Sequence, residues 1–158
     1  MVDFLVIGPR VSIICGNIFP LVKDRRIMIG YNRESMYFDN NKIGVICRWF
    51  QNIRSFDVDP LPLKEYKEGE YDYYDHFDAI NTEKVEDIPD CDLVIGVPIS
   101  FIDKWDYRQF DIVDARNYRK DGMFNDMKIL SLSGWGGEMG AVKGEKKFSR
   151  ILIKKKIS

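Results

Sequence analysis

The sequence predicts an α/β domain with long irregular loops, built around a sheet that contains buried strands. Two continuous apolar runs, at residues 4–7 and 93–98, are typical of strands covered on both faces, as in a parallel sheet. The second observation is size, because 158 residues with 45% hydrophobic side chains suffice for one ordinary core. We therefore expect a single domain that covers residues 1–158.

The N-terminal residues predict half of an open α/β sheet. The apolar run at residues 4–7 ends in Gly8-Pro9, which marks the end of a strand. Apolar positions between residues 13 and 22 predict a short helix interrupted near Pro20, and residues 26–31 predict the next strand. A strand, a crossover and a strand in this order favour two parallel strands in one sheet.

The rest of the chain predicts four further strands, at residues 42–53, 93–98, 110–113 and 148–153. Residues 57–90 hold prolines, a glycine and many acidic residues, which predict a long segment draped over the surface. We expect this segment to be fixed by the packing of four aromatic side chains, Tyr71, Tyr73, Tyr74 and Phe77.

The net charge of −1 hides a strong asymmetry along the chain. Residues 1–56 carry a local charge of +4, residues 57–92 carry −10, and residues 93–158 carry +5. Two basic segments around an acidic one could form a positive face for a polyanion. The plainer alternative is a solvated acidic loop between ordinary surfaces.

Several classes of site and location are not indicated by the sequence. The three cysteines, Cys15, Cys47 and Cys91, form no C-x-x-C pair, and His76 is the single histidine, so we expect no metal site. Gly134-Trp135-Gly136-Gly137 lacks the spacing of a phosphate-binding loop. No apolar run approaches the roughly 18 residues of a membrane span, and no basic leader precedes one, so we expect a cytoplasmic protein.

Two groups of residues combine the chemistry that suits nucleic acid. The first, Arg48, Trp49, Asn52 and Arg54, brings together side chains that bind phosphates, read base edges and stack on bases. The second is the run Lys154, Lys155 and Lys156, a plausible contact for backbone phosphates. The alternatives are that Trp49 is a core residue and that the lysines only keep the chain soluble.

Five stretches carry a resemblance to a known family, in matching order and spacing over nearly the whole chain. They are residues 18–32, 48–53, 71–81, 95–105 together with 109–115, and 148–156, with GVPISFIDK and FDAIN the most distinctive pieces. Together they resemble the C-terminal half of the EcoRI-type adenine-specific DNA methyltransferases.

The resemblance implies both a reaction and a fold. Enzymes of that family transfer a methyl group from S-adenosylmethionine to the exocyclic amine of adenine in duplex DNA, after rotating the base out of its stack. The implied fold is a partial Rossmann-like methyltransferase fold, a mixed sheet with an antiparallel strand near its C-terminal edge. Residues 4–7 would be the strand that follows the catalytic one.

The sequence departs from the family pattern at the centre of the chemistry. The family's glycine-rich donor loop and its Asp/Asn-Pro-Pro-aromatic turn lie upstream of this region, and the chain contains no Pro-Pro pair. The resemblance therefore gives this chain no catalytic residue and no donor-binding residue. We expect it to contribute fold and DNA contact to a methyltransferase, and to be inactive and without bound S-adenosylmethionine by itself.

The expected partners follow from the same resemblance. DNA is the first, and no membrane is expected. Without the donor-binding strands, the strand at residues 4–7 would leave an apolar edge that natural sheets cover. We expect a second copy, a separately encoded N-terminal half or a rearranged local strand to cover that edge. The alternative function is a stand-alone DNA-binding or protein-interaction module without catalysis.

Overall fold

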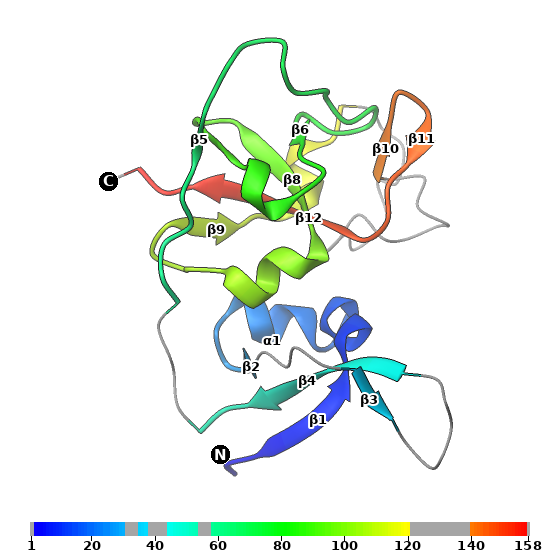
Figure 1. Ribbon diagram of the computed structural model, residues 1–158, viewed down its shortest axis with the longest axis vertical. Coiled ribbons are helices and arrows are strands. Elements are labelled where there is room, and N and C mark those ends of the chain that lie inside the picture. Colours follow the sequence, from blue (N-terminus) through cyan, green and yellow to red (C-terminus); the bar gives the residue numbers. More distant parts are fainter. Residues whose placement is uncertain (1, 31–34, 38–43, 54–57, 121–139, 158) are drawn as a thin grey trace. The chain divides into compact units, whose positions relative to one another are not determined.

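The computed structural model describes residues 2–30, 35–37, 44–53, 58–120 and 140–157 (Figure 1). The chain divides into two compact units, Met1–Asp57 and Val58–Ser158, and each is described by itself. The sequence predicts one domain over all 158 residues, and that grouping stays a prediction.

Unit 1 is organised around one antiparallel strand that pairs with all the others. This central strand is β4 (Gly44–Gln51). It pairs antiparallel with β1 (Leu5–Pro9), β2 (Met28–Gly30) and β3 (Ser35–Tyr37). The strand expected at residues 42–53 is therefore confirmed, and it is the central strand of this sheet.

The predicted parallel crossover in the N-terminal residues is wrong. β4 lies between β1 and β2, so these two strands are not neighbours. Nor is β1 buried on both faces, because Leu5 is 56% exposed and Val6 is 53% exposed. An apolar run predicts extended backbone, but its burial depends on which strands pair with it, and here the pairing partner comes from residues 47–51. Among the described strands β4 is the partner of β1, and further cover of its edge stays a prediction.

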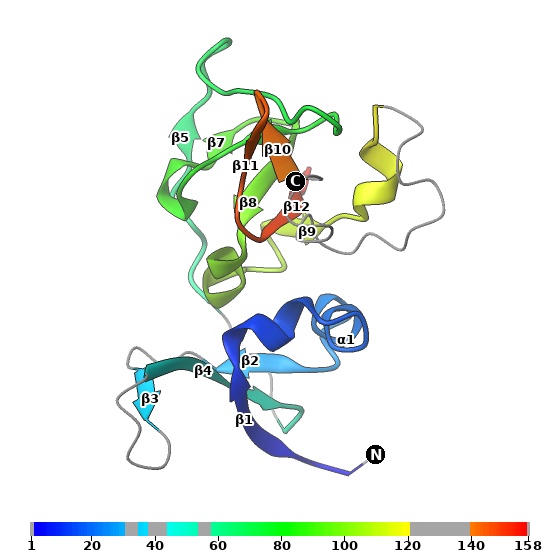
Figure 2. The same ribbon diagram turned by 90° about the vertical axis from the view of Figure 1, so that its right-hand side faces the viewer.

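Two short helical segments pack on one side of the unit 1 sheet (Figure 2). They are the 3-10 helix η1 (Arg10–Ile14) and the α-helix α1 (Phe19–Lys23). Pro20 does not interrupt α1 but lies in its first turn, where no backbone N–H is needed for the helix. The buried apolar side chains of unit 1 are Ile13, Phe19, Val22, Ile27, Cys47 and Phe50.

Unit 2 contains a four-stranded mixed sheet in the order β6-β8-β12-β9. These strands are β6 (Ile80–Asn81), β8 (Val94–Pro98), β12 (Arg150–Lys155) and β9 (Phe110–Ile112). β6 is parallel to β8, whereas β12 is antiparallel to both β8 and β9. The strands expected at residues 93–98, 110–113 and 148–153 are confirmed in this sheet.

The remaining elements of unit 2 are short. Two-residue strands form a parallel pair, β5 (Lys64–Glu65) with β7 (Pro89–Asp90), and a hairpin, β10 (Ala141–Val142) with β11 (Glu145–Lys146). The 3-10 helices are η2 (Val85–Asp87), η3 (Ile99–Lys104) and η4 (Ala115–Tyr118). The described residues thus form a mixed α/β structure with several sheets and few helices. The Rossmann-like arrangement stays a proposal.

The acidic segment is fixed by aromatic packing, as expected, although only two of the four rings are fully buried. Tyr74 and Phe77 are 0% exposed and belong to the core that Leu152 of β12 also joins. Tyr71 is half-buried and its hydroxyl donates to the Asp87 carbonyl, whereas Tyr73 is 45% exposed.

The Tyr74 ring lies directly against the backbone of β8 at Gly96. A Cβ atom on Gly96 would lie 2.2 Å from Cε2 and 2.4 Å from the hydroxyl oxygen of Tyr74. Carbon atoms in contact lie about 3.5–4.0 Å apart, so only glycine leaves room for this ring. Gly96 is therefore required by the packing of the acidic segment on the sheet.

We predict that Gly96→Ala lowers the free energy of unfolding by about 1–3 kcal/mol, the usual cost of overpacking a core. Urea unfolding measures this change. Gly16→Ala is the matched control, since an added Cβ at Gly16 meets nothing within 4 Å. Equal stability of the two variants would show that the Tyr74 ring does not occupy this position.

Candidate nucleic-acid interface

Arg48 and Trp49 of the first predicted group lie in β4 and Asn52 follows that strand, and the three side chains have different surroundings. Arg48 is 3% exposed, and its guanidinium donates to the Cys47 carbonyl at 2.8 Å. Trp49, the next residue, is 39% exposed, so it is neither a core residue nor fully solvated. Arg54 lies outside the described residues. Of the described members, Trp49 offers the most surface to a ligand.

Asn52 uses its side chain to hold the N-terminus of β1. Its Nδ2 donates to the Val2 carbonyl at 3.0 Å, and its Oδ1 accepts from the Phe4 N–H at 2.8 Å. The amide thereby extends the β1–β4 pairing by one more step. These bonds are a structural role, and the DNA contact proposed for Asn52 stays a prediction.

The second predicted group, Lys154 to Lys156, lies at the end of β12. It lines a hollow of about 410 Å³ together with Asp111, Val113 and Ile157. Lys155 forms an ion pair with Asp90, and the Lys156 ammonium lies 3.1 Å from the Asp111 carboxylate. The hydrogen bond to Asp90 raises the pKa of Lys155, so this side chain stays a cation. All three lysines are partly exposed at one place on the surface.

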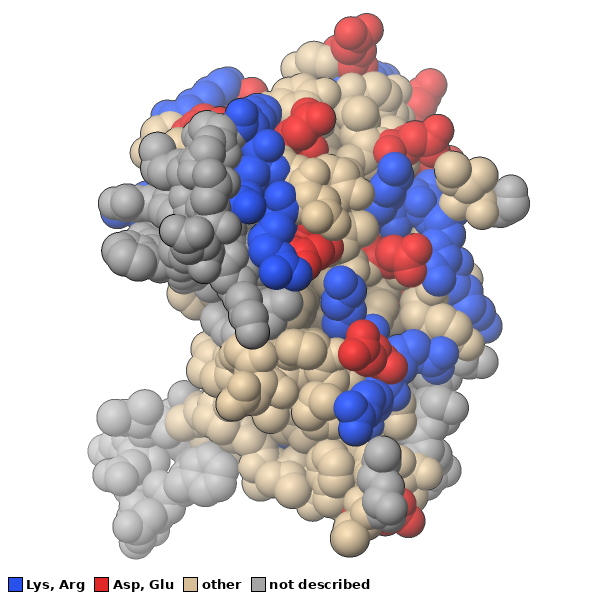
Figure 3. Space-filling model, turned by 180° about the vertical axis from the view of Figure 1, so that it is seen from behind, with Lys and Arg blue, Asp and Glu red and all other residues tan. Residues whose placement is uncertain are grey.

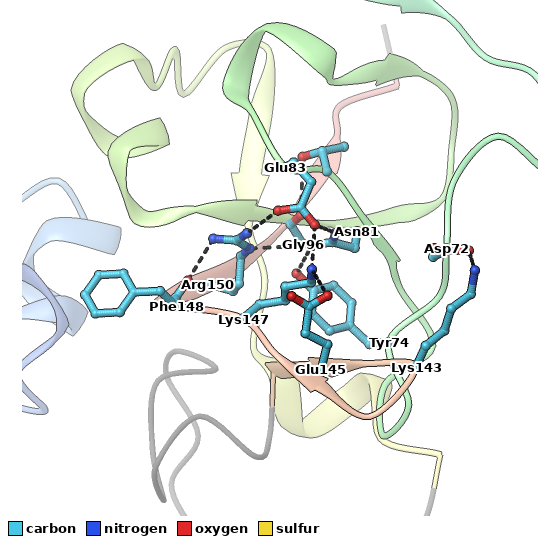
Figure 4. Close-up of polar contacts among 11 residues, drawn as sticks. Asp72, Tyr74, Asn81, Glu83, Gly96, Lys143, Glu145, Lys147, Phe148 and Arg150 are labelled. Carbon is cyan, nitrogen blue, oxygen red and sulfur yellow. Dashed lines mark hydrogen bonds and ion pairs between the residues drawn. The ribbon is translucent and has the colours of Figure 1, made fainter.

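A cluster of polar side chains that the sequence did not indicate links β6 to β12 across the sheet (Figure 4). The Tyr74 hydroxyl donates to Asn81 Oδ1 at 2.8 Å, and Asn81 Nδ2 donates to Glu83 Oε1 at 2.9 Å. Arg150, at the start of β12, donates to Glu83 Oε2 at 3.1 Å. We call Tyr74, Asn81, Glu83, Lys147 and Arg150 the β12 cluster.

Charge in the β12 cluster converges on Glu83. Its Oε1 lies 3.0 Å from the Lys147 ammonium, which also lies 2.9 Å from Glu145. The hydrogen bond from Lys147, aided by that from Asn81, holds the pKa of Glu83 below its ordinary value of 4.5. Burial raises the pKa of the Tyr74 hydroxyl, which stays protonated. The cluster is thus an anion held between two cations beside a neutral phenol.

The sequence shows the members of this cluster but not their assembly. Lys147 and Arg150 are basic residues shortly before the predicted phosphate contact at Lys154–Lys156, yet Arg150 is only 7% exposed. Asn81 and Glu83 lie 69 and 67 residues away from Arg150 along the chain. Their position in or near the distinctive FDAIN stretch is the one signal that could have pointed to them.

The basic hairpin β10–β11 is attached to the acidic segment through its turn. Lys143 and Gly144 both have positive φ, 51° and 75°, as a two-residue type I′ turn requires. The Asp75 carboxylate accepts from both of their backbone N–H groups, each at 2.8 Å. These bonds, that from Gly144 above all, lower the pKa of Asp75.

We predict that Asp75→Ala lowers the free energy of unfolding by roughly 1–2 kcal/mol near neutral pH, because two N–H groups lose their acceptor. The folded-state pKa of Asp75 lies below its ordinary value of 3.8, so the effect is present above that pH. It is lost as the pH falls through the folded-state pKa.

Urea unfolding over a pH series measures this difference. Asp59→Ala is the control, because Asp59 is exposed and its replacement removes the same negative charge. A difference between wild type and Asp75→Ala that does not change with pH would contradict the role of the carboxylate.

The described residues show two further absences. No group of three or more His, Cys, Asp or Glu side chains among them could hold a metal ion. No helix in the described ranges is long and apolar enough to cross a membrane.

Comparison with known proteins gives a consistent set of matches. The chain is 33% identical to the type II methyltransferase M.EcoRI of Escherichia coli, over 97% of this chain and 50% of that protein. It is 27% identical to M.MgeORF184P of Mycoplasma genitalium and to M.MpnI of Mycoplasma pneumoniae, over 97% and 98% of this chain and 57% of each relative. The chain thus spans about half the length of these curated relatives. No solved structure matches.

The family described as "Adenine-specific methyltransferase EcoRI" matches residues 39–156, which is most of the chain. This match confirms the resemblance found in the sequence. The chain belongs to the EcoRI adenine-specific methyltransferase family.

Proposed function

We propose that this chain is the C-terminal part of an S-adenosylmethionine-dependent, adenine-specific DNA methyltransferase, and that it contributes fold and DNA contact. One observation carries the proposal. The relatives named type II methyltransferases align with 97% or more of this chain, whereas the chain spans only 50–57% of their length. A region that occupies half of such an enzyme has a role in its reaction without holding every part of it.

The proposal gives the methyl transfer itself to residues beyond these 158. The chain contains no Pro-Pro pair, so it does not carry the turn that holds the target adenine in this family. The donor loop and that turn would come from the rest of the same polypeptide or from a separately encoded N-terminal half. A partial Rossmann-like sheet, a restriction-modification context and a cytoplasmic location belong to the same proposal.

DNA contact is supported by the cations at the end of β12. Lys and Arg side chains gather in groups on the surface, with Asp and Glu beside them (Figure 3). Two of the three lysines at the hollow pair with carboxylates that are more than half exposed, and such exposed pairs contribute little. A DNA phosphate can therefore replace a carboxylate there at small cost. Lys154 lines the same hollow and is partly exposed.

We predict that Lys154→Gln weakens binding to duplex DNA and lowers the slope of log affinity against log salt by about one unit, because one phosphate contact is lost. Fluorescence anisotropy with a labelled duplex between about 50 and 200 mM salt measures both quantities. Lys67→Gln makes the same charge change in the acidic segment and should leave both unchanged. An equal effect of the two variants would count against a contact at this site.

A methyl-transfer assay tests the larger proposal. We predict that the chain alone transfers no labelled methyl group from S-adenosylmethionine to adenine in duplex DNA. Transfer should appear when a protein that carries the donor loop and the Pro-Pro turn from the same locus is added. Transfer by this chain alone would contradict the proposal. Salt-dependent DNA binding with no transfer in either mixture would favour the alternative, a DNA-binding module without catalysis.

A further inference from the structure

One large aromatic side chain, that of Phe148, is exposed to solvent two residues before β12 begins. Phe148 is 71% exposed, compared with 45% for Tyr73 and 39% for Trp49, the other exposed aromatic residues that the structure describes. Full burial of a phenylalanine side chain is worth about 1.5–3 kcal/mol, and most of that is forgone here.

Two hydrogen bonds hold the backbone at Phe148 and at the next residue. The Phe148 carbonyl accepts from the Arg150 guanidinium at 2.7 Å, and that guanidinium is fixed in turn by Glu83. The next residue, Ser149, is buried and its carbonyl accepts from the Ile99 N–H at 3.0 Å. The Phe148 ring is therefore presented from a rigid support rather than from a loose loop. Figure 4 shows the Phe148 ring pointing away from the β12 cluster, whose side chains point toward one another.

Basic residues lie close to Phe148 in the sequence, although Lys147 and Arg150 are held by Glu83. The segment from residue 143 to residue 150 holds Lys143, Lys146, Lys147 and Arg150 against the single acid Glu145. The Lys143 ammonium pairs with the Asp72 carboxylate at 2.7 Å, but the two side chains are 74% and 50% exposed, so a phosphate can replace that carboxylate at small cost. An exposed apolar ring between cations is the combination that contacts nucleic acid, with cations at phosphates and the ring against a base.

The same surroundings argue against a protein partner. Apolar docking sites on proteins are contiguous patches, whereas Lys147 and Ser149 flank Phe148 directly. In unit 2, the large apolar side chains described as exposed are Tyr73, Phe148 and Ile157, which come from three separate segments. A single exposed ring offers little apolar area to a protein partner, but its face is large enough to stack on a base.

We propose that Phe148 is a DNA-stacking residue, which inserts against a base of duplex DNA while the neighbouring cations contact the phosphates. The inference rests on the proposed function and adds a specific contact to it. Inserted apolar side chains unstack a base step, and the cost is lowest where a base is already mispaired. Phe148 should therefore favour duplexes that contain a mismatched base over fully paired ones.

The test uses the full chain and two duplexes of equal length, one fully paired and one with a single mismatch beside 2-aminopurine. Phe148→Ala should lower the affinity about 5- to 150-fold, the range for loss of one stacked base. The slope against salt should stay unchanged because no phosphate contact is lost. The rise in 2-aminopurine fluorescence on binding should also disappear, and Phe148→Trp should retain both signals.

Two controls separate stacking from other effects. Tyr73→Ala removes another exposed ring of unit 2 and should leave the affinity unchanged. Thermal unfolding of Phe148→Ala should match wild type, because the ring is mostly exposed.

The outcomes distinguish this inference from the proposed function. Wild-type affinity and fluorescence in Phe148→Ala would overturn the stacking role while DNA binding by the chain still stands. A lower affinity together with a slope smaller by about one unit would also overturn it, since a lost phosphate contact would be the cause. If wild type shows no salt-dependent DNA binding at all, both proposals fail.

Discussion

The close packing of the Tyr74 ring on Gly96 is the contact on which the rest of unit 2 depends. It brings a ring from the acidic segment onto the middle of β8, and the hydroxyl of that ring then reaches Asn81 on β6. Asn81 meets Glu83, and Glu83 meets Arg150 at the start of β12. A single position without a side chain on β8 thus lets β6 and β12 share one hydrogen-bonded cluster. Arg150 in turn donates a hydrogen bond to the Phe148 carbonyl, so the same chain of contacts holds the backbone at Phe148.

The acidic segment also decides how the basic residues are used. Its carboxylates meet cations from the C-terminal part of the chain, as Asp72 does with Lys143, Glu83 with Lys147 and Asp90 with Lys155. The sequence left open whether the segment is a solvated loop or the counterpart of a positive face. In unit 2 the acidic segment is not simply a solvated loop, because its carboxylates form ion pairs with particular basic side chains. The basic side chains that can bind a polyanion are then those whose carboxylate partners are exposed, because a phosphate can replace such a partner.

Local sequence signals predicted the strands of unit 2 well because those strands are short apolar runs bounded by turns. β8, β9 and β12 appear where apolar side chains concentrate, and their burial follows. The same reasoning failed for residues 4–7, whose composition matches a buried strand although Leu5 and Val6 are exposed. Composition sets the conformation of such a run, whereas its partner is chosen by residues about 40 positions away.

The candidate site was predicted less well than the fold, for a related reason. Residue type indicates what a side chain can bind but not whether a neighbour already uses it. Arg48 and Asn52 have the chemistry of base-reading residues, yet Arg48 is buried and the Asn52 amide bonds to the backbone of Val2 and Phe4. Arg150 looks like a surface cation in the sequence and is a buried support in the structure. Only the structure distinguishes exposed side chains such as Phe148 and Lys154 from side chains that are buried or already hydrogen-bonded.

The electrostatics of the β12 cluster bear on where the chemistry of the family resides. A general acid or base works best with a pKa near the operating pH. In this cluster the shifts run the other way, since burial raises the pKa of Tyr74 and the cations lower that of Glu83. The phenol therefore keeps its proton and the carboxylate stays charged across the neutral range. Groups tuned in these directions hold a structure in place rather than move protons, which agrees with the proposal that residues outside this chain carry out the methyl transfer.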